Sequence, residues 1–106
     1  PSKAKQLVWT GRRISGEEAA ALGIVVEMTE PGEALDAARS MAAEICSQAP
    51  LAVMFSKCLI DQGVDMTFRQ GWLQEGDLAF ALSFSEDRKE GLAAFSEKRK
   101  PVFSGK

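Results

Sequence analysis

The sequence predicts a mainly α-helical fold, and three kinds of observation favour it. Apolar residues recur at the spacing of three to four that one face of a helix requires. Serine or threonine stands just before several of these segments, where its side-chain oxygen can accept a bond from an unpaired backbone amide. Glycine and proline separate the segments, and only Ile24–Val26 has the β-branched composition of a strand. Five or six helices joined by short turns are therefore expected.

We expect a single helical segment over residues 1–106, in which residues 1–28 form a helix-turn-helix and strand linker and residues 33–106 form the main helices. Residues 3–9 have apolar side chains at helical spacing and are predicted to be the end of a helix. Gly11 suits the position just beyond that helix, because it accepts the left-handed backbone found there.

The second helix is predicted over residues 17–22. Ser15 and Glu18 have the spacing of a capping box, in which each side chain accepts a bond from the other residue's backbone amide. Gly23 suits the left-handed position after this helix. The β-branched residues 24–26 are then expected to form a short strand.

Two further helices follow the turn residues Glu30–Gly32. The first is amphipathic and covers residues 34–47. Its predicted inner face consists of Leu35, Ala38, Met41, Ala42 and Ile45. The second starts at Pro50, whose missing amide costs nothing in a first turn, and ends near Gly63. Residues 51–60 are apolar nearly all round, which indicates a central helix buried on most sides.

The helix predicted from residue 68 to 84 begins with a second capping box, formed by Thr67 and Gln70. Its large apolar residues cover more than one stripe, so one face is expected to meet another subunit. These residues are Phe68, Trp72, Leu73, Phe80 and Phe84.

The last helix is predicted over residues 86–98, with Ser85 as its N-cap. Glu86 and Asp87 stand at the positive end of the helix dipole, and Lys98, Arg99 and Lys100 stand at the negative end. Few of its residues are apolar, so on its own it would be marginally stable.

Composition excludes several classes of protein. Of the 106 residues, 45% are hydrophobic and 26% are charged, which is ordinary for a globular chain and unlike disorder. A net charge of −2 provides no cationic field for nucleic acid. No apolar run approaches the roughly 20 residues that span a bilayer, so no membrane partner is expected and the predicted location is cytoplasmic or the matrix of an organelle.

Residues typical of catalysis are scarce, and no catalytic residue is assigned. Histidine is absent, which excludes a histidine-based triad, and no metal site is expected from Cys46 and Cys58, which we interpret as reduced core residues. Lys57 adjoins Cys58 but faces another side of its helix, so it should not activate the thiol. Glu75 stands mid-helix near the predicted apolar face, where a structural partner is favoured over a role as general acid.

Phe95 and Lys98 form the remaining candidate site. Because they are three residues apart, a ring and an ammonium on one side of the helix could together meet an adenine and a phosphate. The same residues have a structural interpretation, since basic residues favour the end of any helix and Phe95 is a natural packing anchor.

Residues Ser85–Phe103 resemble the C-terminal signature of the enoyl-CoA hydratase/isomerase (crotonase) family, Ser/Thr-x-Asp-x-x-Glu-Gly-x-x-Ala-Phe-x-Glu-Lys-Arg-x-Pro-x-Phe. The resemblance extends over essentially the whole chain, in the same order and spacing. Its other blocks are Ala4–Leu7, Thr10–Ser15, Glu18–Val25, and Pro50–Val53 with Lys57.

The resemblance implies that this chain is the C-terminal helical part of a crotonase-like fold, without the β/α spiral core. In that family the core supplies an oxyanion hole of two backbone amides and the acidic residues that move protons on an acyl-CoA thioester, so no catalytic role carries over to this chain. The family's C-terminal helices pack on the core and across a trimer, or a dimer of trimers. The residues matching Phe95 and Lys98 contact the adenine and phosphate end of CoA.

We therefore expect a part of an enzyme that acts on 2-enoyl-CoA thioesters, with CoA thioester as substrate and no separate cofactor. Alone, the chain should be inactive. The alternative is a free-standing helical module, derived from the same family, that binds another protein through its apolar faces.

Overall fold

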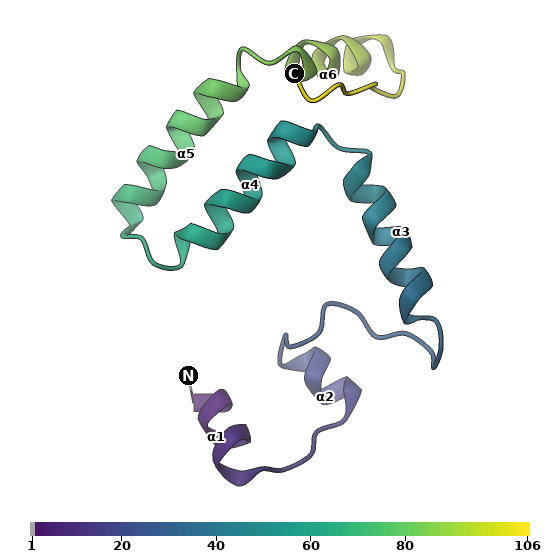
Figure 1. Ribbon diagram of the computed structural model, residues 1–106, viewed down its shortest axis with the longest axis vertical. Coiled ribbons are helices and arrows are strands. Elements are labelled where there is room, and N and C mark those ends of the chain that lie inside the picture. The colour runs from purple at the N-terminus through teal and green to yellow at the C-terminus, as the bar shows by residue number, and fades with distance from the viewer. Residues whose placement is uncertain (1) are drawn as a thin grey trace. The chain divides into compact units, whose positions relative to one another are not determined.

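A computed structural model of the protein describes residues 2–106 and confirms the mainly α-helical prediction (Figure 1). The helices are α1 (Ser2–Thr10), α2 (Gly16–Ala21), α3 (Ala34–Cys46), α4 (Pro50–Gly63), α5 (Phe68–Leu82) and α6 (Glu86–Glu97). The chain divides into two compact units, residues 1–39 and residues 40–106, and the boundary falls within α3.

The expected strand at residues 24–26 is wrong. These residues form a bend after α2, and no strand occurs anywhere in residues 2–106. The composition was suited to a strand, but a strand is stable only when its backbone groups pair with a neighbour. The described chain offers no such neighbour.

The N-cap of α2 is confirmed, but only half of the predicted capping box is present. Ser15 Oγ accepts the Glu18 backbone N–H at 3.1 Å. The Glu18 carboxylate does not reach back, because both its oxygens accept bonds from the Arg12 guanidinium, one of them at 2.9 Å. A charge-assisted fork of this kind is stronger than a neutral bond to an amide, so Glu18 ties α2 to the link before it.

In the second unit, α4 and α5 pack side by side as a helical hairpin (Figure 1). Pro50 occupies the first turn of α4 as predicted. The capping box at the start of α5 is complete, since Thr67 Oγ1 accepts the Gln70 amide at 3.3 Å and Gln70 Oε1 accepts the Thr67 amide at 2.9 Å. Across the hairpin, Gln74 Nε2 donates to Gln62 Oε1 at 2.9 Å.

The predicted burial of α4 and of the inner face of α3 is wrong for this chain. Among the described residues, the buried ones are Ala19, Ala94 and Asp87. Residues of α4 are at most half-buried, and Met41 and Ile45 of α3 are 38% and 50% exposed. Periodicity indicated which faces are apolar, but burial also requires a surface that covers them.

Large apolar side chains are exposed along α5 and at Phe84, in the turn just after it. Phe68 and Trp72 meet edge to face with ring centroids 5.8 Å apart, and Phe80 and Phe84 do so at 4.9 Å. All four are at least two-thirds exposed, with relative exposures of 67–82%. Aromatic pairs of this kind add modestly to helix stability, but they leave most of their apolar surface uncovered.

No single helix in residues 2–106 has the length and apolar composition needed to cross a membrane. Only α3 and α4 taken together, across the sharp bend between them, meet those two requirements.

We predict that the 106-residue chain binds the dye ANS and self-associates, because contiguous exposed apolar surface favours both. Replacing Phe80 and Phe84 by Gln should reduce ANS fluorescence and the mean mass in sedimentation while helicity by circular dichroism is kept. Phe103→Gln is the control: its half-buried ring lies near Gly91, so it should lower stability instead. Unchanged ANS binding in the double variant would contradict the prediction.

Candidate functional site

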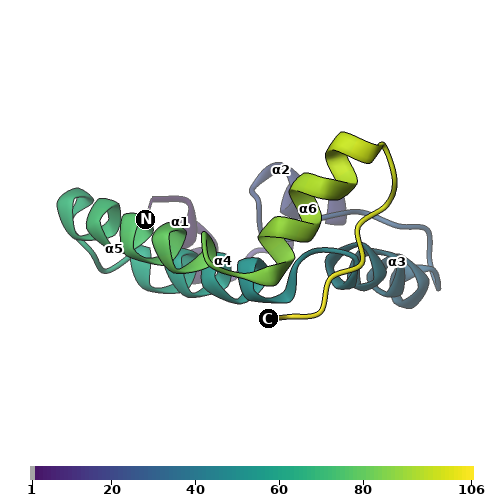
Figure 2. The ribbon, with the colours of Figure 1, turned by 90° about the horizontal axis from the view of Figure 1, so that it is seen from above.

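The candidate site lies at the C-terminal end of α6, where the chain turns back along the helix (Figure 2). Ser85 caps the start of α6 as predicted, with Oγ accepting the Arg88 amide at 3.1 Å. The helix ends at Glu97, one residue before the predicted end, and Lys98 is its C-cap. Residues 99–106, which we call the tail, then return toward the start of the helix.

Asp87 holds the far end of the tail. Its Oδ1 accepts the Ser104 amide at 2.6 Å and the Ser104 hydroxyl at 3.3 Å, and its Oδ2 accepts the Gly105 amide at 2.9 Å. The residue is only 3% exposed. Three donors satisfy a buried carboxylate that would otherwise be costly, so Asp87 does more than the dipole role that its position in the first turn suggested.

The tail also completes the start of α6. The backbone carbonyl of Lys106 accepts the amides of Glu86 and Asp87, at 2.7 and 3.2 Å. Gly105 has φ +76° and lies against the ring of Pro50, at the start of α4. The tail thereby joins the N-terminal ends of α4 and α6 within the second unit.

Glu90 holds the near end of the tail through Arg99. The guanidinium donates from Nη1 to Oε1 at 2.5 Å and from Nη2 to Oε2 at 2.9 Å, and the Val102 amide donates to Oε1 at 2.8 Å. These bonds, the Arg99 fork first and the Val102 amide second, lower the pKa of Glu90 from its ordinary 4.5 to about 2. The same fork raises the pKa of Arg99, so Arg99 is a structural cation.

Phe95 and Lys98 lie at the turn that these bonds fix. The Phe95 side chain is 86% exposed in the last turn of α6, so it is not the packing anchor that the structural interpretation proposed. Lys98 has φ 54° and ψ 37°, the left-handed conformation, which costs a residue with a Cβ roughly 1 kcal/mol. The expected basic last turn is absent from α6, because the basic residues start at the C-cap.

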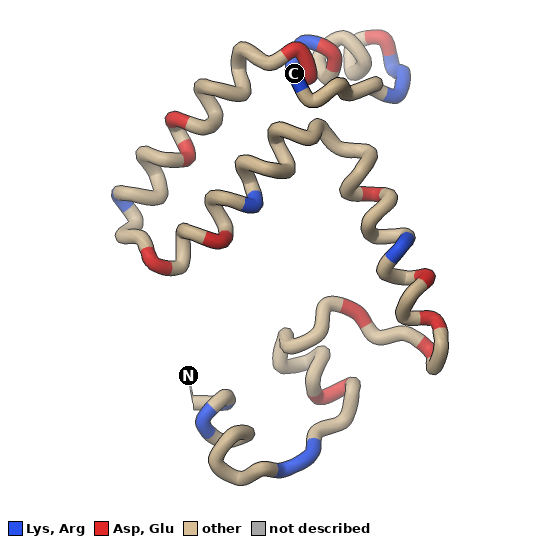
Figure 3. Tube along the Cα trace, in the orientation of Figure 1, with Lys and Arg blue, Asp and Glu red and all other residues tan. Residues whose placement is uncertain are grey.

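Two of the three basic residues at this end differ in whether they form ion pairs. Arg99 is paired with Glu90 and Glu97, whereas Lys98 forms no salt bridge within the described residues. Charged residues are frequent along α6 and the tail and sparser along α4 and α5 (Figure 3). An exposed ring and an ammonium without an ion pair among residues 2–106 therefore lie at this end of the helix.

The other candidates from the sequence do not form a second site. Cys46 and Cys58 are free thiols, as expected, but Cys46 is exposed and Cys58 half-buried, so the expected core position is wrong. Lys57 pairs with Asp61, four residues on, rather than with the neighbouring thiol. That contact raises the pKa of Lys57.

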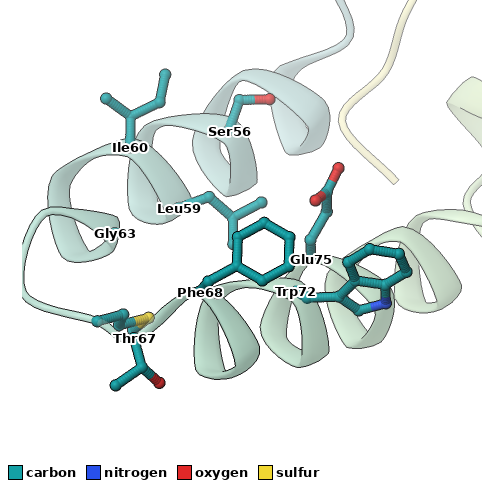
Figure 4. A pocket seen from close by; sticks show the side chains of 10 residues that line it. Ser56, Leu59, Ile60, Gly63, Thr67, Phe68, Trp72 and Glu75 are labelled. Atoms are coloured by element: carbon teal, nitrogen blue, oxygen red, sulfur yellow. The ribbon is translucent and has the colours of Figure 1, made fainter.

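Glu75 lies at a groove between α4 and α5, together with Ser56, Leu59, Phe68 and Trp72 (Figure 4). The groove has a volume of about 460 Å³ and is mostly apolar. No ion pair of Glu75 occurs among residues 2–106, and no group in that range could hold a metal ion. Among the described residues that line the groove, Glu75 is the only acid, and no base lies beside it.

The sequence reasoning missed the roles of Asp87, Glu90 and Arg99 in holding the tail. Asp87 and Glu90 are three residues apart and therefore share one side of α6, but that spacing does not indicate which residues they hold.

Comparison with known proteins places this geometry in a family. The sequence profile of the family described as Enoyl-CoA hydratase/isomerase matches residues 1–106. Human "Enoyl-CoA hydratase domain-containing protein 2, mitochondrial" is 46% identical over 97% of this chain and 37% of its own length. "Crotonyl-CoA hydratase" from Syntrophomonas wolfei is 38% identical over 100% of this chain and 41% of its own length.

A solved structure has the same fold. The crystal structure of enoyl-CoA hydratase from Bacillus anthracis matches with a TM-score of 0.95 and 35% identity, covering 100% of this chain and 41% of that one. The chain thus spans about two fifths of the length of the relatives that it matches.

We predict that Asp87→Asn lowers the free energy of unfolding by about 1–3 kcal/mol, because an amide N–H would face the Gly105 amide in place of Oδ2. Glu86→Gln is the matched control: it also neutralises an acid in the first turn, but the Glu86 side chain is exposed and makes no hydrogen bond in the described chain. Urea unfolding measures both. Equal losses would contradict the assigned role of Asp87.

The Glu90 contact also predicts a pH dependence. Because the pKa of Glu90 is lower in the folded chain, the carboxylate stabilises the fold above its unfolded pKa of 4.5, and this contribution is lost as the pH falls toward about 2. The difference in Tm between the unmodified chain and Glu90→Gln should therefore shrink over that range. The difference in Tm between the unmodified chain and Arg99→Gln should shrink over the same pH range. A difference in Tm that does not change with pH would contradict the assigned role of the Glu90 carboxylate.

Proposed function

The chain belongs to the enoyl-CoA hydratase/isomerase family, and on that premise we propose that it is the C-terminal helical part of an enzyme acting on 2-enoyl-CoA thioesters. The observation that carries the proposal is the family match over residues 1–106, together with a coverage of only about two fifths of each relative. An acyl-CoA is the proposed substrate, and fatty-acid or related acyl-CoA metabolism is the proposed setting.

In this proposal the chemistry resides in the part of the enzyme that precedes these helices. Stabilising a thioester enolate requires preorganised hydrogen-bond donors, and moving its protons requires positioned acids or bases. Residues 2–106 bring together no such set: the carboxylates with the most partners, Asp87 and Glu90, are fully engaged by the tail. We therefore propose that the chain alone has no hydratase activity.

The first proposed task of the helices is oligomer contact, as a trimer or a dimer of trimers. Exposed aromatic residues on α5 support it, because extended apolar surface on a soluble helix usually marks an interface. Phe80 and Phe84 form the end of this surface nearest to α6 in the chain.

The second proposed task is to form one edge of the CoA site, with Phe95 and Lys98 at its adenine and phosphate end. Their exposure and the absence of a salt bridge to Lys98 within residues 2–106 support this. An exposed ring can stack on a base, and an ammonium can neutralise a phosphate.

The proposed location is the cytoplasm or the matrix of an organelle. Several relatives are named as mitochondrial, and others are bacterial. The second candidate function, a helical module that binds another protein, is supported by the same apolar surface of α5. The two proposed functions predict different results when the chain is joined to the catalytic core of a family member.

The test joins the complete chain to the preceding segment of the Syntrophomonas wolfei crotonyl-CoA hydratase, in place of that enzyme's matching region. We expect hydration of crotonyl-CoA by the chimaera and none by the 106-residue chain. Turnover by the chain alone, or a soluble but inactive chimaera, would refute the proposal; the second outcome would favour the interaction module.

In the chimaera, Phe95→Ala and Lys98→Met should each raise KM for crotonyl-CoA about tenfold with little change in kcat, since each removes a contact made equally in the ground and transition states. Lys89→Met is the matched control: it removes another exposed lysine of α6 that has no ion pair within residues 2–106. A KM unchanged in both site variants would exclude them from the CoA site.

A further inference from the structure

Lys98 occupies a backbone conformation that favours glycine. It is the sole non-glycine residue with positive φ among residues 2–106. The turn around it is a Schellman motif, in which the Arg99 amide donates to the Ala94 carbonyl at 3.0 Å and the Lys98 amide donates to the Phe95 carbonyl at 3.3 Å. Glycine would form this motif without strain, so the lysine is kept there at a conformational cost.

Arg99 holds this turn from both sides. Its Nε donates to Glu97 Oε2 at 2.6 Å, immediately before the strained residue, while its two terminal nitrogens bind Glu90 two turns earlier in α6. The guanidinium therefore links the backbone on either side of Lys98 to the body of the helix. A planar fork with five donors can make this bridge, whereas the point charge of a lysine cannot.

The same bonds also occupy two acids of α6, one of which directly precedes Lys98 in the chain. Glu97 is adjacent in sequence, and its carboxylate is taken by Arg99. Glu90 is likewise taken by Arg99 and by the Val102 amide. If Arg99 were removed, Glu97 and Glu90 would both lose their cation, and the Glu97 carboxylate, adjacent in sequence, would attract the Lys98 ammonium.

We propose that Arg99 is a positioning residue for Lys98: it fixes the left-handed turn and keeps the neighbouring Glu97 carboxylate from neutralising the ammonium that meets a phosphate of the acyl-CoA. The inference rests on the proposed function, because it requires Lys98 to contact the ligand. It assigns to Arg99 an effect on ligand affinity that passes entirely through Lys98.

A double-mutant cycle in the chimaera tests this. Arg99→Gln should raise KM for crotonyl-CoA about threefold to tenfold with kcat within about twofold, and the Kd for coenzyme A by calorimetry should rise in parallel. When Lys98 is already Met, adding Arg99→Gln should change KM by less than about twofold, because effects that share one residue are not additive. Arg88→Gln is the matched control: it removes another exposed arginine of α6, one without an ion pair in the described chain.

Conservative variants separate positioning from stability. Arg99→Lys keeps the charge but not the fork, so it should fold and still raise KM; Glu97→Gln should raise KM less, because the bonds from Arg99 to Glu90 remain. Should Arg99→Gln fail to fold, these two variants carry the same cycle with Lys98→Met.

The outcomes are distinct. If Lys98→Met leaves KM unchanged, the proposed CoA contact fails, and the positioning role fails with it. If Lys98→Met raises KM but the Arg99 variants either leave KM unchanged or raise it equally in both backgrounds, the contact stands and the positioning role is overturned.

Discussion

The arrangement of α6 and the tail depends on one constraint: two carboxylates on the same side of α6 must accept the hydrogen bonds that the tail donates. Asp87 takes the backbone amides of Ser104 and Gly105, and Glu90 takes the guanidinium of Arg99 and the amide of Val102. Because bonds to ionised acceptors are short and strong, a tail without secondary structure acquires a defined path. That path includes the left-handed turn at Lys98. It also brings the Lys106 carbonyl to the first amides of α6.

Local features could be predicted from the sequence. The caps at Ser15, Thr67 and Ser85, the proline start of α4 and nearly all helix ends depend on residues within a few positions of one another. Such interactions are encoded in spacing, and spacing is visible in a single chain.

Features that join distant residues could not be predicted in this way. Asp87 meets residues 17 and 18 positions away, and no periodicity indicates such a pairing. Glu18 has the spacing of a capping box, but a stronger partner, Arg12, takes its carboxylate. The prediction that α4 is buried failed for a similar reason. An apolar face on α4 shows that a surface must be covered, but it does not show which part of the protein covers it. Of the candidate site, Phe95 and Lys98 were proposed from the motif and stay a prediction, while the residues that hold the turn at Lys98 were not foreseen.

The Lys106 carbonyl accepts hydrogen bonds from the first amides of α6. The last residues of the tail therefore contribute to the stability of that helix. Without residues 104–106, α6 would lose that acceptor together with both backbone amides that satisfy Asp87, leaving a buried negative charge at a helix start capped by Ser85 alone. The pairing of these last residues therefore bears on the stability of the whole helix, including the turn at its opposite end that carries Lys98.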